Sequence, residues 1–84
     1  MNIYLIGEYV KRLSKDDILK FARFQGIVLE ENEIDVIFKC IKENYKTIIY
    51  GNPRNILDEL KEQVKPLTYN KIITLYKEFK EKIS

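Results

Sequence analysis

The densest group of side chains that could bind a ligand lies in residues 30–35, which read Glu-Glu-Asn-Glu-Ile-Asp. Carboxylates at this density could hold a calcium ion or act as acid and base in catalysis. The run, however, lacks the alternate-position ligands, the central glycine and the terminal glutamate of a calcium-binding loop. Negative side chains are also favoured at the positive, N-terminal end of a helix. We therefore interpret the run as the start of a helix and expect no metal there.

Other residue types that carry catalysis are scarce. The chain has no histidine, a single cysteine, Cys40, and three isolated glycines. It therefore cannot build a Cys/His zinc site, a Ser–His or Cys–His nucleophile pair, or a glycine-rich phosphate loop. Cys40 falls beside a predicted buried face, which favours a structural thiol, and a lone cysteine fits a reducing cytoplasm. We expect no catalytic residue, no cofactor and no enzyme activity.

Basic side chains offer a different chemistry, the binding of phosphates. The chain has a net charge of +2, and residues 45–84 carry eight Lys/Arg against five Asp/Glu, a net charge of +3. Asp58 falls in one helical row with Arg54 and Lys61, so ion pairs within the helix explain that row without a ligand. Because these ion pairs weaken the case for a phosphate ligand, we keep weak nucleic-acid binding only as the alternative hypothesis. Its candidate contacts are Arg54, Lys61, Lys65, Lys77 and Lys80.

Helix signals divide the first part of the chain. Residues 3–12 are predicted to form a first helix. Ser14 is a good N-cap, and Asp17 occupies the capping-box position three residues later. The second helix then runs to Gln25, where Gly26 supplies the left-handed residue that ends it.

A third helix is predicted over residues 30–44. Together with the second helix it resembles a DNA-binding helix-turn-helix, because Ala22 and Gly26 have the spacing common in that motif. The N-terminal residues of the second helix of such a motif enter the major groove. Here those residues are acidic and would face phosphates, so we reject a DNA-reading role.

The remaining segments are shorter. Residues 46–50, Lys-Thr-Ile-Ile-Tyr, are β-branched and aromatic, and we expect an extended connector without a partner strand. Asn52 followed by Pro53 predicts an N-cap and first helical residue for a fourth helix that ends at about Lys65. Pro66 is expected to stop that helix, and Thr68 to cap a fifth that runs to the C-terminus.

Hydrophobic periodicity predicts how these helices pack. In the third helix about half the circumference is apolar, which predicts a central position in the fold. The residues on that face are Ile34, Ile37, Phe38, Ile41 and Tyr45. The longest apolar run, residues 3–6, is far below the roughly 20 residues that a membrane span needs. We predict one all-α domain over residues 1–84, a compact bundle of four to five short helices.

The helix at residues 3–12 breaks this pattern, because its apolar side chains point in nearly every direction. A helix that is apolar all round must be covered on all sides. Either a second protein or a second copy of this chain covers it, or the connector at residues 46–50 folds over it. We favour a protein-interaction module or a homo-oligomer such as a homodimer, with no membrane partner. The candidate interface residues are Ile3, Tyr4, Leu5, Ile6, Tyr9 and Tyr50.

Two segments carry a resemblance to a known family. Residues 13–29 read Leu-Ser-Lys-Asp-Asp-Ile-Leu-Lys-Phe-Ala-Arg-Phe-Gln-Gly-Ile-Val-Leu. An isoleucine-rich helix follows, and residues 48–54 then read Ile-Ile-Tyr-Gly-Asn-Pro-Arg. This order resembles the YqfT-like family of short helical proteins of Bacillales, a domain-of-unknown-function family, over residues 13–79. The resemblance implies an all-helical cytoplasmic protein of a Gram-positive bacterium. It supplies no activity and no site residue.

Overall fold

A computed structural model describes the backbone of residues 3–83 and the side chains of residues 5–82. Within that range the chain forms helices and no strand, in a bundle of about 31 × 25 × 21 Å. The helices are α1 (Ile3–Arg12), α2 (Lys15–Phe24), α3 (Glu31–Tyr50), α4 (Arg54–Gln63) and α5 (Pro66–Ile83). The predicted all-α bundle is confirmed.

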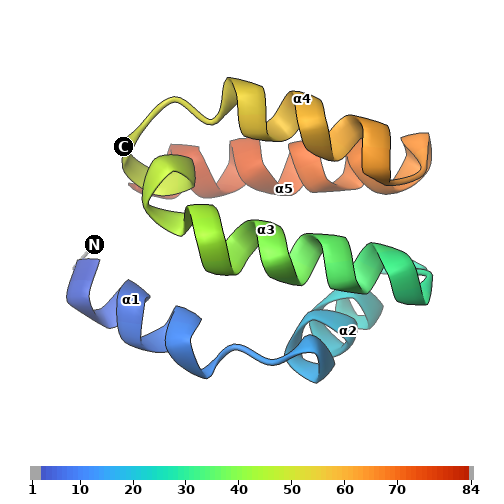
Figure 1. Ribbon diagram of the computed structural model, residues 1–84, viewed down its shortest axis with the longest axis horizontal. Coiled ribbons are helices and arrows are strands. Elements are labelled where there is room, and N and C mark those ends of the chain that lie inside the picture. The colour runs from blue at the N-terminus through green and yellow to red at the C-terminus, as the bar shows by residue number, and fades with distance from the viewer. Residues whose placement is uncertain (1–2, 84) are drawn as a thin grey trace.

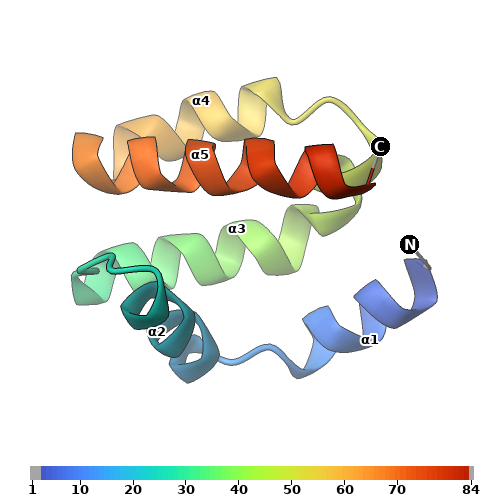
Figure 2. The same cartoon turned by 180° about the vertical axis from the view of Figure 1, so that it is seen from behind.

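The longest helix, α3, lies at the centre of the bundle (Figure 1). It separates α1 and α2 on one side from α4 and α5 on the other, and the view from behind shows the same order (Figure 2). It packs against α1, α2 and α4, while α4 packs against α5. This central position agrees with the wide apolar face read from its sequence.

Both ends of α2 form as predicted. The Ser14 hydroxyl accepts from the Asp17 backbone N–H at 3.1 Å, and the Asp17 carboxylate accepts from the Ser14 N–H at 2.9 Å, which makes a complete capping box. At the other end Gly26 has a φ of 73°, and the N–H of Ile27 reaches back to the Ala22 carbonyl at 2.8 Å. This is the glycine-based C-terminal motif that turns the chain sharply toward α3.

The prediction of an extended connector at residues 46–50 was wrong, because α3 continues through it to Tyr50. The low helix propensity of β-branched residues is a weak preference that packing overrides. Ile49 is buried, and it lies eight residues after Ile41, on the same helix face. In addition, Lys80 Nζ of α5 donates to the Ile49 carbonyl at 2.9 Å, which satisfies one of the open carbonyls at the end of α3.

The junction between α4 and α5 also differs from the prediction. Pro66 was expected to end the fourth helix, but α4 ends at Gln63 and Pro66 is the first residue of α5, a position that suits proline. Thr68 was expected to be an N-cap and instead lies buried in the first turn of α5. The cap comes from α3, because Glu33 Oε2 accepts from the Lys65 backbone N–H at 2.8 Å.

The start of α4 shifts by one residue. Pro53 takes the N-cap position that had been assigned to Asn52. The Asn52 side chain still accepts from the Arg54 N–H at 3.1 Å, so it satisfies one open donor of the helix end as predicted. Among the helices of residues 3–83, none has the length and apolar content that crossing a membrane requires.

Candidate functional site

An apolar groove lies between α1 and α2 on one side and α5 on the other, with α3 as its floor. Its volume is about 440 Å³, within the range of ligand and docking pockets. Asp17 is the one ionised side chain in its lining, and its carboxylate is engaged in the capping box with Ser14. The lining residues are Tyr9, Val10, Leu13, Asp17, Ile18, Phe21, Ala22, Ile27, Leu29, Ile37, Ile41, Ile72, Leu75 and Phe79.

The wall formed by α1 is fixed to α3 by polar contacts. Lys42 Nζ donates to the carbonyls of Val10 at 2.6 Å and Lys11 at 2.9 Å, at the C-terminal end of α1, where a cation is favoured. The same ammonium lies 5.3 Å from the centre of the Phe38 ring. Near the middle of α1, a Cβ on Gly7 would lie 3.2 Å from the Tyr45 hydroxyl, so the missing side chain allows a close approach. These contacts hold α1 beside the groove.

Large apolar side chains stand exposed along the edge of the groove. Leu5 is 70% exposed, Tyr9 68% and Phe21 55%. We call these three residues the apolar rim. A second hollow of about 380 Å³, lined by Leu5, Ile6, Tyr9 and Phe79, extends the groove along α1. The rim and the groove therefore form one continuous apolar surface.

The predicted interface residues can be placed only in part. The side chains of Ile3 and Tyr4 lie outside the described residues. Leu5 and Tyr9 are exposed and Ile6 is half-buried, all beside the groove, while Tyr50 is 53% exposed at the far end of α3. Because residues 46–50 belong to α3 and leave Leu5 and Tyr9 exposed, they do not serve as the cover that one reading of the sequence proposed.

Sequence reasoning missed the other wall of this site. Phe21 of α2 and Leu75 and Phe79 of α5 fall on the apolar faces of their helices, and such periodicity alone indicates core packing. Phe21 is exposed, and the other two are half-buried where they line the groove. Periodicity identified the faces correctly, but it cannot tell a closed core from an open one. The groove lies where α1–α2 and α5 flank α3, and all four helices contribute to its lining.

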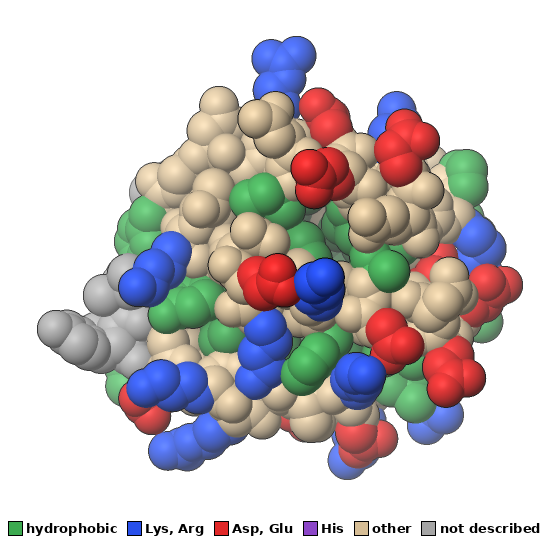
Figure 3. Space-filling model, viewed as in Figure 1, with side chains coloured by type: hydrophobic (Ala, Val, Ile, Leu, Met, Phe, Trp, Pro, Cys, Tyr) green, Lys and Arg blue, Asp and Glu red, His purple; other side chains and the backbone are tan. Residues whose placement is uncertain are grey.

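The basic residues of the nucleic-acid hypothesis are partly engaged within the chain. Lys65 Nζ lies 3.5 Å from Glu30 and 3.7 Å from Glu33, and Lys61 Nζ lies 5.8 Å from the centre of the Tyr69 ring. Lys80 is bound to the end of α3. Arg54 and Lys77 are exposed on α4 and α5. Acidic and basic side chains intermingle on the face shown in Figure 3, so that face does not present one basic surface.

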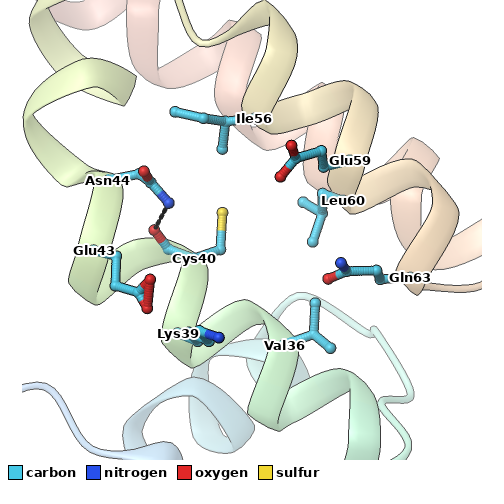
Figure 4. A pocket seen from close by; sticks show the side chains of 9 residues that line it. All are labelled: Val36, Lys39, Cys40, Glu43, Asn44, Ile56, Glu59, Leu60 and Gln63. Carbon is cyan, nitrogen blue, oxygen red and sulfur yellow. Dashed lines mark hydrogen bonds between the residues drawn. The ribbon is translucent and has the colours of Figure 1, made fainter.

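A second, more polar groove of about 450 Å³ separates α3 from α4 and contains Cys40 (Figure 4). Burial is the largest influence on the pKa of the Cys40 thiol and raises it. A hydrogen bond with Asn44 opposes this, while the Glu43 and Glu59 carboxylates, each with a weaker effect, raise the pKa further. A thiol that stays protonated is a weak nucleophile. The groove supplies carboxylates beside the sulfur, which work against its activation.

Glu33 is the one buried carboxylate of the acidic run, at 1% exposure. Burial, the largest single influence, raises its pKa. The Lys65 N–H, the Glu30 N–H and the Thr68 hydroxyl, which donate to the carboxylate, together with the Lys65 ammonium, outweigh that influence and hold the pKa below its ordinary value. The carboxylate therefore joins the starts of α3 and α5, a structural role. Among the described residues, no three His, Cys, Asp or Glu side chains are grouped as metal ligands would be.

Comparisons of the chain with protein-family models, with curated proteins and with solved structures find no significant match. The resemblance to the YqfT-like family stays a prediction from the sequence.

Proposed function

We propose that this protein is a non-catalytic interaction module whose apolar groove receives the apolar face of a protein helix. The observation that carries the proposal is the continuity of the groove with the exposed apolar rim. Contiguous apolar surface of this kind marks interaction sites on small proteins. Aromatic side chains such as Tyr9 and Phe21 are also enriched at protein–protein interfaces.

The chemistry of the lining favours a protein helix as the occupant. An amphipathic helix lays side chains at i, i+3, i+4 and i+7 into a groove of this type. The groove runs between helices, and its lining offers few polar atoms that could orient a small polar substrate. The lone Cys40, together with the YqfT-like resemblance, supports the further proposal that the module works in the cytoplasm of a Gram-positive bacterium.

Photo-crosslinking inside cells tests this function. A photoreactive phenylalanine analogue replaces Phe21 at the edge of the groove, and the same analogue replaces Glu62, an exposed residue of α4, in a matched control. We expect discrete adducts of defined mass from position 21 and none from position 62. Mass spectrometry of the adduct then reads out which residue of which chain lies against the groove.

Equal labelling from both positions, or no adduct from position 21, would contradict the proposal. A variant with Phe21 unchanged and the analogue at Tyr9 guards against a poor crosslinking angle at one position. Because Tyr9 belongs to the same rim, it should yield the same partner as position 21.

A further inference from the structure

The groove is the core of this domain left open on one side. Ile37 and Ile41 of α3, the helix at the centre, are only half-buried where they form the floor, as are Ile72 and Leu75 of α5. None of the aromatic side chains described between residues 5 and 82 is buried. Aromatic rings normally dominate the core of a small domain. One chain therefore leaves unfinished the packing that its apolar residues could complete.

The exposed apolar side chains are large enough to form the centre of a stable dimer interface. Phe24, which is 85% exposed, lies one helical turn from Phe21 on the same side of α2. With a full aromatic side chain contributing about 150–250 Å², the exposed parts of Tyr9, Phe21 and Phe24 amount to roughly 400 Å². Leu5 and the groove floor add to this. A standard interface buries about 800 Å² on each partner, with an apolar centre and a polar rim, so this surface supplies such a centre.

Shape and charge allow the surface to pair with itself. It carries both a ridge, formed by the exposed side chains of α1 and α2, and a groove beside that ridge. A two-fold dimer requires this kind of self-complementary patch. Asp17 is the one charged residue in the lining, so each copy brings a single carboxylate to an otherwise apolar contact.

We propose that the occupant of the groove is a second copy of this chain, in a two-fold dimer in which Tyr9 and Phe21 of each copy enter the groove of the other. This inference rests on the proposed function, because it names the partner of the same surface. A permanent partner fits better than a transient one, since obligate homodimer interfaces resemble a domain core cut in half. The half-covered residues of α3 and α5 are such a core.

Sedimentation equilibrium of the purified full chain tests the dimer. We expect a mass near twice the 10.1 kDa of the chain at concentrations up to about 1 mM. Leu5→Lys should raise the dimer dissociation constant at least tenfold, because it places a charge on the apolar rim. Leu67→Lys is the matched control, since Leu67 is 71% exposed but does not line the groove; it should change the constant less than twofold.

Circular dichroism of each variant checks that the helices remain, and Phe21→Lys provides an independent rim variant. A strict monomer overturns the second copy as the partner. If such a monomer still forms adducts with another protein from position 21, the interaction module stands and only the dimer falls. If it forms none, both fail. A dimer whose dissociation constant is unchanged by Leu5→Lys and Phe21→Lys associates elsewhere, which also overturns the inference.

Discussion

The junction of α3 with α5 and the groove between α1–α2 and α5 complete their packing in different ways. At the junction the Glu33 carboxylate is buried with its hydrogen-bond donors supplied by the same chain. In the groove, Ile41 and Leu75 are half-covered and the rings beside them are exposed. A buried carboxylate without partners is very unfavourable, so it must be satisfied within the chain. Apolar surface has no such requirement and can be completed by another molecule.

Breaking the junction should lower the stability of the fold strongly. Glu33→Ala leaves the part-buried N–H of Lys65 without an acceptor and removes the bonds to Glu30 and Thr68. At about 1–3 kcal/mol for each buried group left unsatisfied, we expect the free energy of unfolding to fall by about 3 kcal/mol. Urea denaturation followed by circular dichroism measures this loss. Glu31→Ala, an exposed residue of the same helix turn, should cost less than about 0.5 kcal/mol, and an equal loss from both would contradict the account.

A pair of leucines compares the closed and open regions directly. Leu60 is 5% exposed between α3 and α4, whereas Leu75 is half-buried in the groove. We expect Leu60→Ala to lower the free energy of unfolding by about 3 kcal/mol, and Leu75→Ala by about half as much when the chains are dilute. The difference between these two losses of stability should become smaller at high protein concentration, where the second copy covers Leu75. Equal losses at low concentration would mean that the groove is already closed within one chain.

The start of α2 and the start of α3, where the Glu30 N–H donates to Glu33, offer a smaller contrast. The box of Ser14 and Asp17 is exposed, whereas Glu33 completes its cap in the buried junction. Ser14→Ala should cost about 1 kcal/mol, the usual value for an N-cap, in the same urea experiment. Ser14→Asp keeps an acceptor at that position and should restore most of the stability. A loss from Ser14→Ala as large as that from Glu33→Ala would remove the distinction between exposed and buried caps.

The stability that Glu33 gives to the junction should depend on pH and be lost in acid. The pKa of Glu33 is held below its ordinary value of 4.5 in the folded protein. Its contribution to stability is therefore fully present above about pH 4.5 and is lost as the pH falls through the folded pKa. The difference in unfolding free energy between the wild type and Glu33→Gln should shrink over that range. A difference in unfolding free energy that does not change with pH would contradict this expectation. Hydrogen bonds from Ser14 lower the pKa of Asp17 as well, but Asp17 is present in both proteins, so its contribution cancels in the difference.

The sequence predicts the positions of the helices well, but it predicts the contacts between helices poorly. Ser14, Asp17 and Gly26 act through neighbours along the chain, so their spacing is enough to identify both ends of α2. Thr68 and Pro66 were misassigned because the cap of α5 comes from Glu33, some thirty residues away, and no local pattern records such a contact. The end of α3 was misplaced for the same reason, since packing of Ile49 outweighs the propensity of its neighbours.

The sequence indicated only one of the two walls of the candidate site. The unusual distribution of apolar residues in α1 indicated Leu5 and Tyr9 as interface residues, and both are exposed beside the groove. The opposite wall could not be identified, because Leu75 and Phe79 have the periodicity of ordinary core positions. Whether a core face is covered depends on how helices distant in sequence are spaced, which hydrophobic periodicity does not specify.

Isotope-filtered nuclear Overhauser spectroscopy can detect contacts between two copies of the groove at the level of single side chains. A sample that mixes isotope-labelled and unlabelled chains at high concentration records only contacts between different molecules. For the proposed dimer we expect contacts from the rings of Tyr9 and Phe21 in one chain to the methyl groups of Ile41 and Leu75 in another. A well-resolved spectrum of the concentrated protein without any such contact would contradict it.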